Sequence, residues 1–200
     1  MPIAIITGAS AGIGRATAGM FLDAQYRVYN LSRRPCPLPG VENLRCDLRD
    51  SNSVEAAMAV LLPAIENADS VALVHNASQM LKDTVADCSD QALTAVLEVN
   101  VVGINTLNRR LLPRLPATSS VIYVGSTLSE KAVPGAFSYV VSKHAQLGMM
   151  RATCQDLMGK GIHTALVCPG FTDTEMLRTH LGNDEETLQA IGGGNSYGRL

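Results

Sequence analysis

A tyrosine and a lysine stand four residues apart in the stretch FSYVVSKHAQL, which runs from Phe137 to Leu147. The apolar residues around them recur at helical spacing, and side chains four apart on a helix share one face. Tyr139 and Lys143 can therefore point into one site. The same spacing also suits two unrelated polar side chains on a solvated helix face, so the pair needs support from other residues.

Proton transfer is the chemistry that such a pair could perform. A free phenol has a pKa of about 10, which is too high for a general base near neutral pH. A neighbouring ammonium stabilises the phenolate and lowers that pKa. We therefore expect Lys143 to make Tyr139 a usable acid and base.

A glycine-rich turn, TGASAGIG, follows the first apolar run of the chain, from Thr7 to Gly14. Its glycines permit a tight turn and a close backbone approach, so the amides and dipole of the next helix can receive a pyrophosphate. The glycine spacing differs from that of the common dinucleotide fingerprint. An ordinary strand-to-helix connection is the alternative interpretation.

The second apolar run ends in VYNLSRRP, about where a dinucleotide fold places the residue that contacts the adenosine ribose. No acid is present there, whereas Ser32, Arg33 and Arg34 are. A hydroxyl followed by guanidinium groups can bind a 2′-phosphate through charge-assisted hydrogen bonds, which favours NADP over NAD. The alternative is that these arginines are solvated loop charges, and we expect this for one of them.

Short apolar runs alternate with amphipathic stretches along the chain. Strands are predicted at Ile3 to Thr7, Arg27 to Leu31, Asn43 to Cys46, Val71 to His75, Val121 to Gly125 and His163 to Cys168. Helices are predicted near 13–25, 51–66, 89–112, 138–159 and 174–191. This alternation indicates one α/β domain over residues 1–200, a doubly wound parallel sheet with helices on both faces.

Composition limits the possible partners. Sixteen basic and 18 acidic residues give a formal net charge of -2, so we expect neither nucleic acid nor an anionic membrane as a partner. The chain shows no signal segment and no apolar stretch of spanning length, which predicts a cytoplasmic protein. Five cysteines without a CxxC pair predict buried thiols rather than disulfides or a metal site.

Several motifs together resemble the short-chain dehydrogenase/reductase family, in its compact single-domain branch, along the whole chain. They are TGASAGIG, CDL at Cys46 to Leu48, HNAS at His75 to Ser78, NVVG at Asn100 to Gly103, Ser126, YVVSK at Tyr139 to Lys143 and PGFTDT at Pro169 to Thr174. Most are weak singly, but their order and spacing are specific. The resemblance implies a Rossmann fold and a nicotinamide cofactor.

The resemblance also assigns roles to a catalytic set. Tyr139 would give a proton to a carbonyl oxygen or take one from an alcohol, and Ser126 would donate a hydrogen bond to the same oxygen. Lys143 would tune the phenol and hold the nicotinamide ribose. Asn100 would distort its helix and hold a water in a proton relay; an exposed asparagine without a relay is the alternative.

The cofactor contacts implied by the resemblance extend over several segments. Asp47 would accept from the adenine amino group, although capping of the following helix is a competing role. HNAS departs from the usual NNAG at both His75 and Ser78. The predicted contacts are Gly8, Ser10, Ala11, Gly12, Ile13, Gly14, Ser32, Arg33, Arg34, Asp47, Leu48, Asn76, Ala77, Tyr139, Lys143, Pro169, Gly170, Thr172 and Thr174.

The carboxyl end departs from the family pattern, because NSYGRL resembles the point where members continue into a further helix and strand. We therefore expect a sheet that lacks its last strand, whether the chain is truncated or naturally short. Residues 174–195 are predicted to form a lid over the substrate. By resemblance, segments 89–112 and 138–159 would form a homodimer or homotetramer.

These observations predict an NADP(H)-dependent oxidoreductase that transfers hydride between nicotinamide and a small-molecule carbonyl or secondary alcohol, working as a carbonyl reductase. Two alternatives stay open: a cofactor-binding regulatory protein without turnover, and a sugar-nucleotide epimerase or dehydratase. The substrate itself is beyond the sequence, because the residues that would line its pocket lie in the variable segments 80–90, 128–137 and 174–195.

Overall fold

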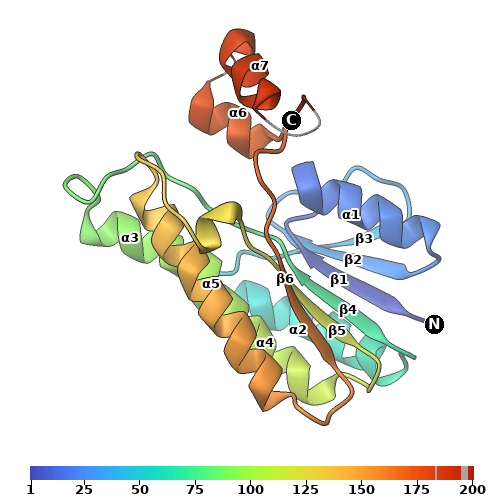
Figure 1. The fold of residues 1–200 in the computed structure, drawn as a ribbon. Helices are drawn as coiled ribbons and strands as arrows, with labels where there is room; N and C mark the ends of the chain where they lie inside the picture. The colour runs from blue at the N-terminus through green and yellow to red at the C-terminus, as the bar shows by residue number, and fades with distance from the viewer. Residues whose placement is uncertain (183, 195–197) are drawn as a thin grey trace.

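Six parallel strands form one sheet in a computed structural model that describes residues 1–182, 184–194 and 198–200 (Figure 1). The strand order is β3-β2-β1-β4-β5-β6. The strands are β1 (Ile3–Thr7), β2 (Arg27–Ser32), β3 (Val41–Arg45), β4 (Val71–His75), β5 (Ser120–Val124) and β6 (His163–Val167). All six predicted strands are confirmed, with bounds that shift by at most one or two residues.

Helices connect the strands in the alternation that the sequence predicts. They are α1 (Gly12–Asp23), α2 (Ser51–Glu66), α3 (Asp90–Leu97), α4 (Gly103–Leu111), α5 (Phe137–Asp156), α6 (Glu175–Leu181) and α7 (Glu185–Gly193). A π-helical turn, η1 (Glu98–Val102), joins α3 to α4, and the short 3₁₀ turns η2 (Leu112–Arg114) and η3 (Thr127–Ser129) flank β5. No helix among the described residues is long and apolar enough to cross a membrane.

The core lies in two layers because β1 is buried on both faces. Ile3 and Ile5 pack with residues of α2 and α4 in the larger cluster. Ala4 and Ile6 pack with Ala18 of α1 in the smaller one. Helices therefore cover both faces of the sheet, as predicted.

The strand order reverses at β1, which pairs with β2 on one side and with β4 on the other. In parallel α/β sheets the crevice at such a reversal, at the carboxyl ends of the strands, is where ligands bind. Because all six strands are parallel, the segments that follow them all begin at the carboxyl-terminal end of the sheet (Figure 1). Every motif of the predicted site except the one on α5 and the one in η1 lies in those segments.

One predicted helix is corrected by the structure, and another shows the distortion that the family resemblance implied at Asn100. The stretch 89–112 is interrupted by η1, where Asn100 lies. The stretch 174–191 is two helices, because Gly182 adopts a φ of 89° that ends α6, and the Asp184 side chain then caps α7. Residues 183 and 195 of the predicted lid lie outside the described part of the chain.

All five cysteines are free thiols, as predicted, but they are not all buried. Cys36 and Cys46 lie in the core, and Cys88 is half-buried. Cys154 and Cys168 are exposed, so the prediction of buried thiols is wrong for these two. Cys168 follows β6, whose position at the edge of the sheet leaves its ends open to solvent.

Among the described residues, β6 forms the sheet edge beyond β5. Both ends of β6 are exposed and its middle is half-buried, whereas β1 and β4 are buried throughout. The candidate site therefore lies between the well-packed centre of the sheet and a less protected edge.

Gly103 gives a stability test, because a Cβ there would lie 2.7 Å from Cβ of Leu48 and 3.1 Å from the Glu98 carbonyl oxygen. We predict that Gly103→Ala lowers the free energy of unfolding by about 1–2 kcal/mol, since overpacking outweighs the gain in helix propensity. Gly148→Ala on α5 is the control, because a Cβ there meets nothing within 4 Å. Urea denaturation should show this control unchanged or stabilised by up to about 1 kcal/mol; equal losses in both variants would contradict the packing argument.

Candidate active site

Tyr139, Lys143 and Ser126 come together beside the end of β5. Tyr139 and Lys143 lie in the first two turns of α5, and Ser126 is the N-cap of η3, two residues after β5. The Ser126 hydroxyl interacts with the Tyr139 phenol, and Lys143 Nζ lies 5.3 Å from the centroid of the Tyr139 ring. The pair is therefore not on a solvated helix face: Tyr139 is 9% exposed and Lys143 is 1% exposed.

Burial controls the ionisation of both groups. It raises the pKa of Tyr139, while hydrogen bonding to Ser126 and Ser78 acts in the opposite direction. Burial also lowers the pKa of Lys143 to about 7, with a smaller opposing effect from Cys168. Burial disfavours the charged form of each group in the protein by itself. The prediction that Lys143, together with the positive ring of an oxidised nicotinamide, makes the phenol more acidic stays a prediction.

Asn100 links the loop after β4 to α5. Its Nδ2 donates to the Gln79 carbonyl oxygen at 2.8 Å and to Ser142 Oγ at 2.9 Å, and its Oδ1 accepts from the Gln79 amide at 2.7 Å. Asn100 is fully buried, which excludes the alternative of an exposed asparagine. The helix distortion implied by the family resemblance is present as the π turn η1.

Asp83 holds the start of α5, a role that the sequence analysis missed. Its Oδ1 accepts from the Ser138 amide at 3.1 Å, and its carbonyl oxygen accepts from the Phe137 amide at 3.2 Å. The N-cap residue of α5, Ala136, makes no side-chain cap. Burial raises the pKa of Asp83, but hydrogen bonds from Ser138, Cys88 and the Phe137 amide together hold it below its ordinary value. No sequence signal marks Asp83, because its partners on α5 lie more than 50 residues away.

The glycine-rich turn is packed tightly against the loop after β4. Gly8 has a φ of 72°, and a Cβ there would lie 2.9 Å from Cα of Ala77. Gly14 would place a Cβ 2.4 Å from the Gly8 carbonyl oxygen. Asn76 Nδ2 donates to the carbonyl oxygens of Thr7 and Gly8 at 2.9 and 3.0 Å. Asn76 and Ala77 therefore support the turn directly.

Asn30 of β2 is a second residue that sequence reasoning missed. It is 1% exposed, and its Oδ1 accepts from the Ala9 amide at 2.9 Å. Its Nδ2 donates to the Arg34 carbonyl oxygen at 3.2 Å and to Asn43 Oδ1 at 2.8 Å. Asn30 thus joins the glycine-rich turn to the loop that follows β2. A polar residue inside the buried stretch RVYNLS was the available signal.

Ser32, the last residue of β2, lies beside the glycine-rich turn. Ser32 Oγ lies 3.4 Å from Ser10 Oγ and donates to it. Arg33 is exposed. Hydrogen bonds from Arg49 lower the pKa of Asp47, and the charge of Arg33 adds a smaller effect in the same direction. Arg34 instead forms a two-point ion pair with Glu175 of α6, with both N–O distances at 3.0 Å. One arginine therefore already has a carboxylate partner.

Asp47 and Leu48 follow β3, at the same carboxyl-terminal end of the sheet as the glycine-rich turn. Both carboxylate oxygens of Asp47 accept from the Arg49 guanidinium, at 3.2 and 3.0 Å. The N-cap of α2 is Asp50, whose Oδ1 accepts from the Asn52 amide. The competing interpretation of Asp47 as that cap is therefore wrong. Leu48 is buried and belongs to the larger core cluster.

The turn after β6 lies across the glycine-rich turn. The Pro169 carbonyl oxygen accepts from the Thr127 amide at 3.0 Å, and Thr172 Oγ1 donates to the Gly170 carbonyl oxygen at 3.3 Å. Thr174 caps α6, and its Cγ2 would lie 3.1 Å from a Cβ at Gly12. The predicted contacts Ser10, Ala11, Gly12, Ile13 and Thr174 are thus brought into one region.

The described residues contain no cluster of three or more His, Cys, Asp or Glu side chains that could hold a metal ion. His75 Nε2 lies 2.7 Å from Asn108 Oδ1, and Asn108 Nδ2 donates to the Tyr123 hydroxyl at 2.8 Å. Burial lowers the pKa of His75 to about 4, so its ring is neutral near neutral pH. His75 therefore belongs to a buried polar network between β4, β5 and α4.

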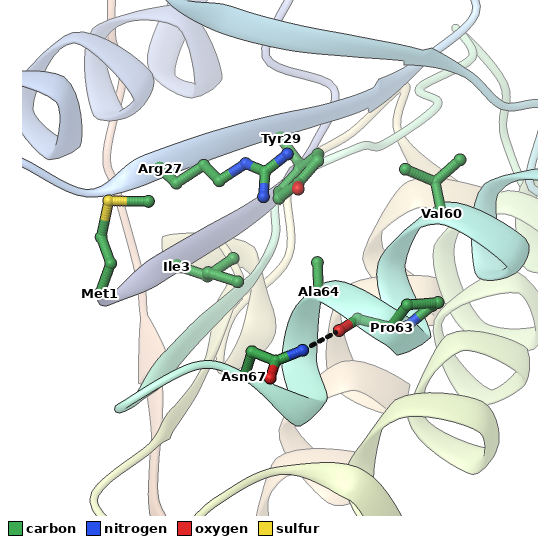
Figure 2. A pocket seen from close by; sticks show the side chains of 8 residues that line it. All are labelled: Met1, Ile3, Arg27, Tyr29, Val60, Pro63, Ala64 and Asn67. Carbon is green, nitrogen blue, oxygen red and sulfur yellow. Dashed lines mark hydrogen bonds between the residues drawn. The ribbon is translucent and has the colours of Figure 1, made fainter.

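A cavity of about 350 Å³ lies at the opposite end of the sheet (Figure 2). It is lined by Met1, Ile3, Arg27, Tyr29, Val60, Pro63, Ala64 and Asn67, and Figure 2 shows the Arg27 guanidinium beside the Tyr29 ring. None of these residues belongs to the predicted site. The cavity is at the amino ends of β1 and β2, whereas ligands of such sheets bind at the carboxyl ends.

The strand order and the glycine-rich turn after β1 together define a Rossmann-type fold. The sequence model of the short chain dehydrogenase family matches residues 2–185. The chain therefore belongs to the short-chain dehydrogenase/reductase family, an oxidoreductase family that acts on CH–OH groups.

Relatives and solved structures agree with this assignment. 2-(R)-hydroxypropyl-CoM dehydrogenase of Xanthobacter autotrophicus is 31% identical over 94% of this chain and 82% of its own. Sulfoacetaldehyde reductase 2 of Chromohalobacter salexigens is 29% identical over 94% of this chain and 80% of its own. The structure of a single-substitution variant of actinorhodin polyketide ketoreductase with NADPH has a TM-score of 0.87 at 26% identity, covering 100% of this chain and 84% of that one.

Asn30 gives a test of how the glycine-rich turn is held. We predict that Asn30→Ala lowers the free energy of unfolding by about 1–3 kcal/mol, because the buried Ala9 amide loses its acceptor. Asn105→Ala on the exposed side of α4 is the matched control and should stay within about 0.5 kcal/mol of the parent protein. Urea denaturation measures both. Equal stability of the two variants would show that Asn30 does not hold the turn.

Proposed function

We propose that this protein is an NADP(H)-dependent carbonyl reductase that interconverts a small-molecule carbonyl and a secondary alcohol, with Tyr139 as general acid and base. The observation that carries the proposal is the meeting of the Tyr139 phenol, the Ser126 hydroxyl and the Lys143 ammonium at the carboxyl ends of the strands. Its membership of an oxidoreductase family supports the reaction class.

The residues at the reversal of the sheet fit a dinucleotide. The N-cap of α1, Ala11, makes no side-chain cap, so the first amides of this helix are available to a phosphate group. Gly8 and Gly12 have positive φ values of 72° and 54°, a backbone conformation that favours glycine. Because glycine has no side chain, the turn stays open at these positions. When bound, the nicotinamide supplies hydride for reduction and accepts it for oxidation.

The segments that would hold the cofactor are those of the sequence prediction. The glycine-rich turn would receive the pyrophosphate, Ser32 with Arg33 or Arg34 the adenosine ribose, and Asp47 with Leu48 the adenine. The turns at Asn76 to Ala77 and Pro169 to Thr174 would flank the nicotinamide, and Lys143 would hold its ribose hydroxyls.

Each catalytic side chain has a distinct task in reduction. Tyr139 donates its phenolic proton to the carbonyl oxygen as that oxygen gains negative charge, and the phenolate is left behind. Ser126 donates a hydrogen bond to the same oxygen and so stabilises the developing charge. The Lys143 ammonium stabilises the phenolate electrostatically. In oxidation the phenolate takes the alcohol proton, which reverses each step.

The loop after β2 supports NADP rather than NAD. A 2′-phosphate would find the Ser32 hydroxyl and two guanidinium groups there, and no carboxylate directly on the loop to repel it. Arg33 is the first candidate, because Arg34 is paired with Glu175 and would have to leave that partner. NADPH as the working cofactor favours reduction as the physiological direction.

The wider features of the prediction remain proposals as well. We infer that residues 1–200 work as one domain, with the described part of 174–195 as a cover over the substrate. The contacts of Thr174 with Gly12 and of Glu175 with Arg34 support a cover that reaches the cofactor region. A cytoplasmic location and a homodimer or homotetramer stay predictions of the sequence and of the family.

Tyr139→Phe tests the proton donor. We predict that NADPH oxidation with a panel of ketones falls by about 10²- to 10⁴-fold, the usual contribution of a general acid, while NADPH affinity changes little. Tyr26→Phe is the matched control, because Tyr26 packs on Phe21 on the other side of the sheet. Unchanged turnover in the Tyr139→Phe protein would refute the assignment.

Arg33→Ala tests the cofactor preference. We predict that NADPH binds about 10- to 100-fold more weakly, the value of a lost charge-assisted hydrogen bond, while NADH affinity changes by less than about threefold. Arg34→Ala should have a smaller effect, because Glu175 already pairs with that guanidinium. Cofactor fluorescence measures both affinities, with Lys160→Ala as a distant control. Equal weakening of NADPH and NADH would refute phosphate recognition by this loop.

A further inference from the structure

Gln146 occupies a buried position between Lys143 and the π turn η1. It lies three residues after Lys143 on α5 and is 1% exposed. Lys143 Nζ donates to Gln146 Oε1 at 3.0 Å. Gln146 Nε2 donates to the Asn100 carbonyl oxygen at 2.8 Å. A single side chain thus connects the ammonium to the turn that holds Asn100.

The amide is the chemical group that suits both neighbours. An ammonium can only donate hydrogen bonds and a carbonyl oxygen can only accept them, so the bridging group needs an acceptor on one side and a donor on the other. Gln146 presents Oε1 to Lys143 and Nε2 to Asn100, and the Asn100 carbonyl fixes which way the amide points. An apolar side chain here would leave both buried partners without this bond.

No carboxylate pairs with the Lys143 ammonium among the described residues that contact it. Its second acceptor is the carbonyl oxygen of Val124, at 2.9 Å, at the end of β5. The titratable groups that face it are Tyr139 on its own helix and Cys168 after β6, while η1 contributes the uncharged Asn100. Two neutral oxygens therefore carry the hydrogen bonding of a buried cation, consistent with its lowered pKa of about 7.

The hydrogen bonds continue from the π turn back to the tyrosine. Asn100 Nδ2 donates to Ser142 Oγ at 2.9 Å, and Ser142 Oγ donates to the Tyr139 carbonyl oxygen at 2.7 Å. Lys143, Gln146, Asn100, Ser142 and Tyr139 are therefore joined by a chain of buried hydrogen bonds across α5 and η1. Gln146 is the member that connects this chain to the ammonium.

We propose that Gln146 is a positioning residue that holds the Lys143 ammonium in place and ties it, through the π turn at Asn100, to the helix segment that carries Tyr139. The proposal rests on the proposed function for its role in the reaction, but its structural content is independent of any substrate. The neutral amide of Gln146 fixes the position of the Lys143 ammonium by a hydrogen bond, without forming a buried ion pair with it.

The side-chain titration of Lys143 tests the proposal in the protein alone. We would follow the ε-carbon of ¹³C-labelled lysine by NMR and assign the signal with Lys143→Arg. Gln146→Glu keeps the shape of the side chain and places a carboxylate within hydrogen-bond reach of Nζ. It should raise the pKa of Lys143 by about 1–3 pH units, because an opposite charge at that distance favours the ammonium.

Gln146→Leu should shift the titration in the opposite direction, because the ammonium loses an acceptor while staying buried. Gln155→Glu is the matched control, since it adds the same charge to the exposed side of the same helix and should leave Lys143 unchanged. If Gln146 had only a structural role, both Gln146 variants would have a lower melting temperature, but the pKa of Lys143 would not shift in opposite directions. If Gln146→Leu does not fold, the isosteric Gln146→Glu variant decides the matter.

The inference is overturned if Lys143 titrates at the same pH in folded Gln146→Glu protein as in the parent. The pH profile of ketone reduction then separates this inference from the proposed function. If the Lys143 ammonium assists Tyr139, activity falls as pH rises through the Lys143 pKa, so Gln146→Glu should move this alkaline limb upward. A shifted titration with an unmoved limb would uphold the position of Gln146 and refute the assigned role of Lys143.

Discussion

A buried lysine side chain whose acceptors in the described part of the chain are neutral oxygens is the constraint on which the site depends. Charged groups lose hydration when they leave water, so a buried ammonium survives only where oxygen atoms surround it. Here the end of β5 supplies the Val124 carbonyl and α5 supplies the Gln146 amide. Both acceptors are neutral, and burial therefore brings the pKa of Lys143 to about 7. The position of the ammonium beside Tyr139 thus requires β5, α5 and η1 to be packed together.

The cofactor side of the crevice is built on the same physical rule, that buried polar groups need partners. Asn30 and Asn76 lie on opposite sides of the glycine-rich turn, and each satisfies backbone groups of that turn. Their side chains replace the hydrogen bonds that an irregular turn cannot make with itself. A turn held in this way can keep the first amides of α1 exposed to a ligand, because its own shape does not depend on them.

Local patterns were sufficient for much of the architecture. Short apolar runs predicted all six strands. Tyr139 and Lys143 lie on one helix as expected, because four-residue spacing is a property of a single helix. Prediction was wrong where a local feature interrupts a pattern, because Gly182 divides 174–191 into two helices. The π turn η1 within 89–112 was expected only from the family resemblance, which implied a distortion at Asn100. Asp83, Asn30 and Gln146 were missed, because each has at least one partner that is distant in sequence and their types are ordinary in loops, strands and helices.

The sequence by itself determined the fold class, the order of the motifs and the identity of the groups that could transfer a proton. These depend on periodicity and on spacing within single elements, which the chain encodes locally. Tertiary structure decided how those groups are charged and held. Segments that are distant along the chain bury Tyr139 and Lys143. Distant segments also supply the pairing of Arg34 with Glu175 and the contact of Gln146 with Asn100. Such effects arise from desolvation and hydrogen bonding between packed elements, and no single segment contains them.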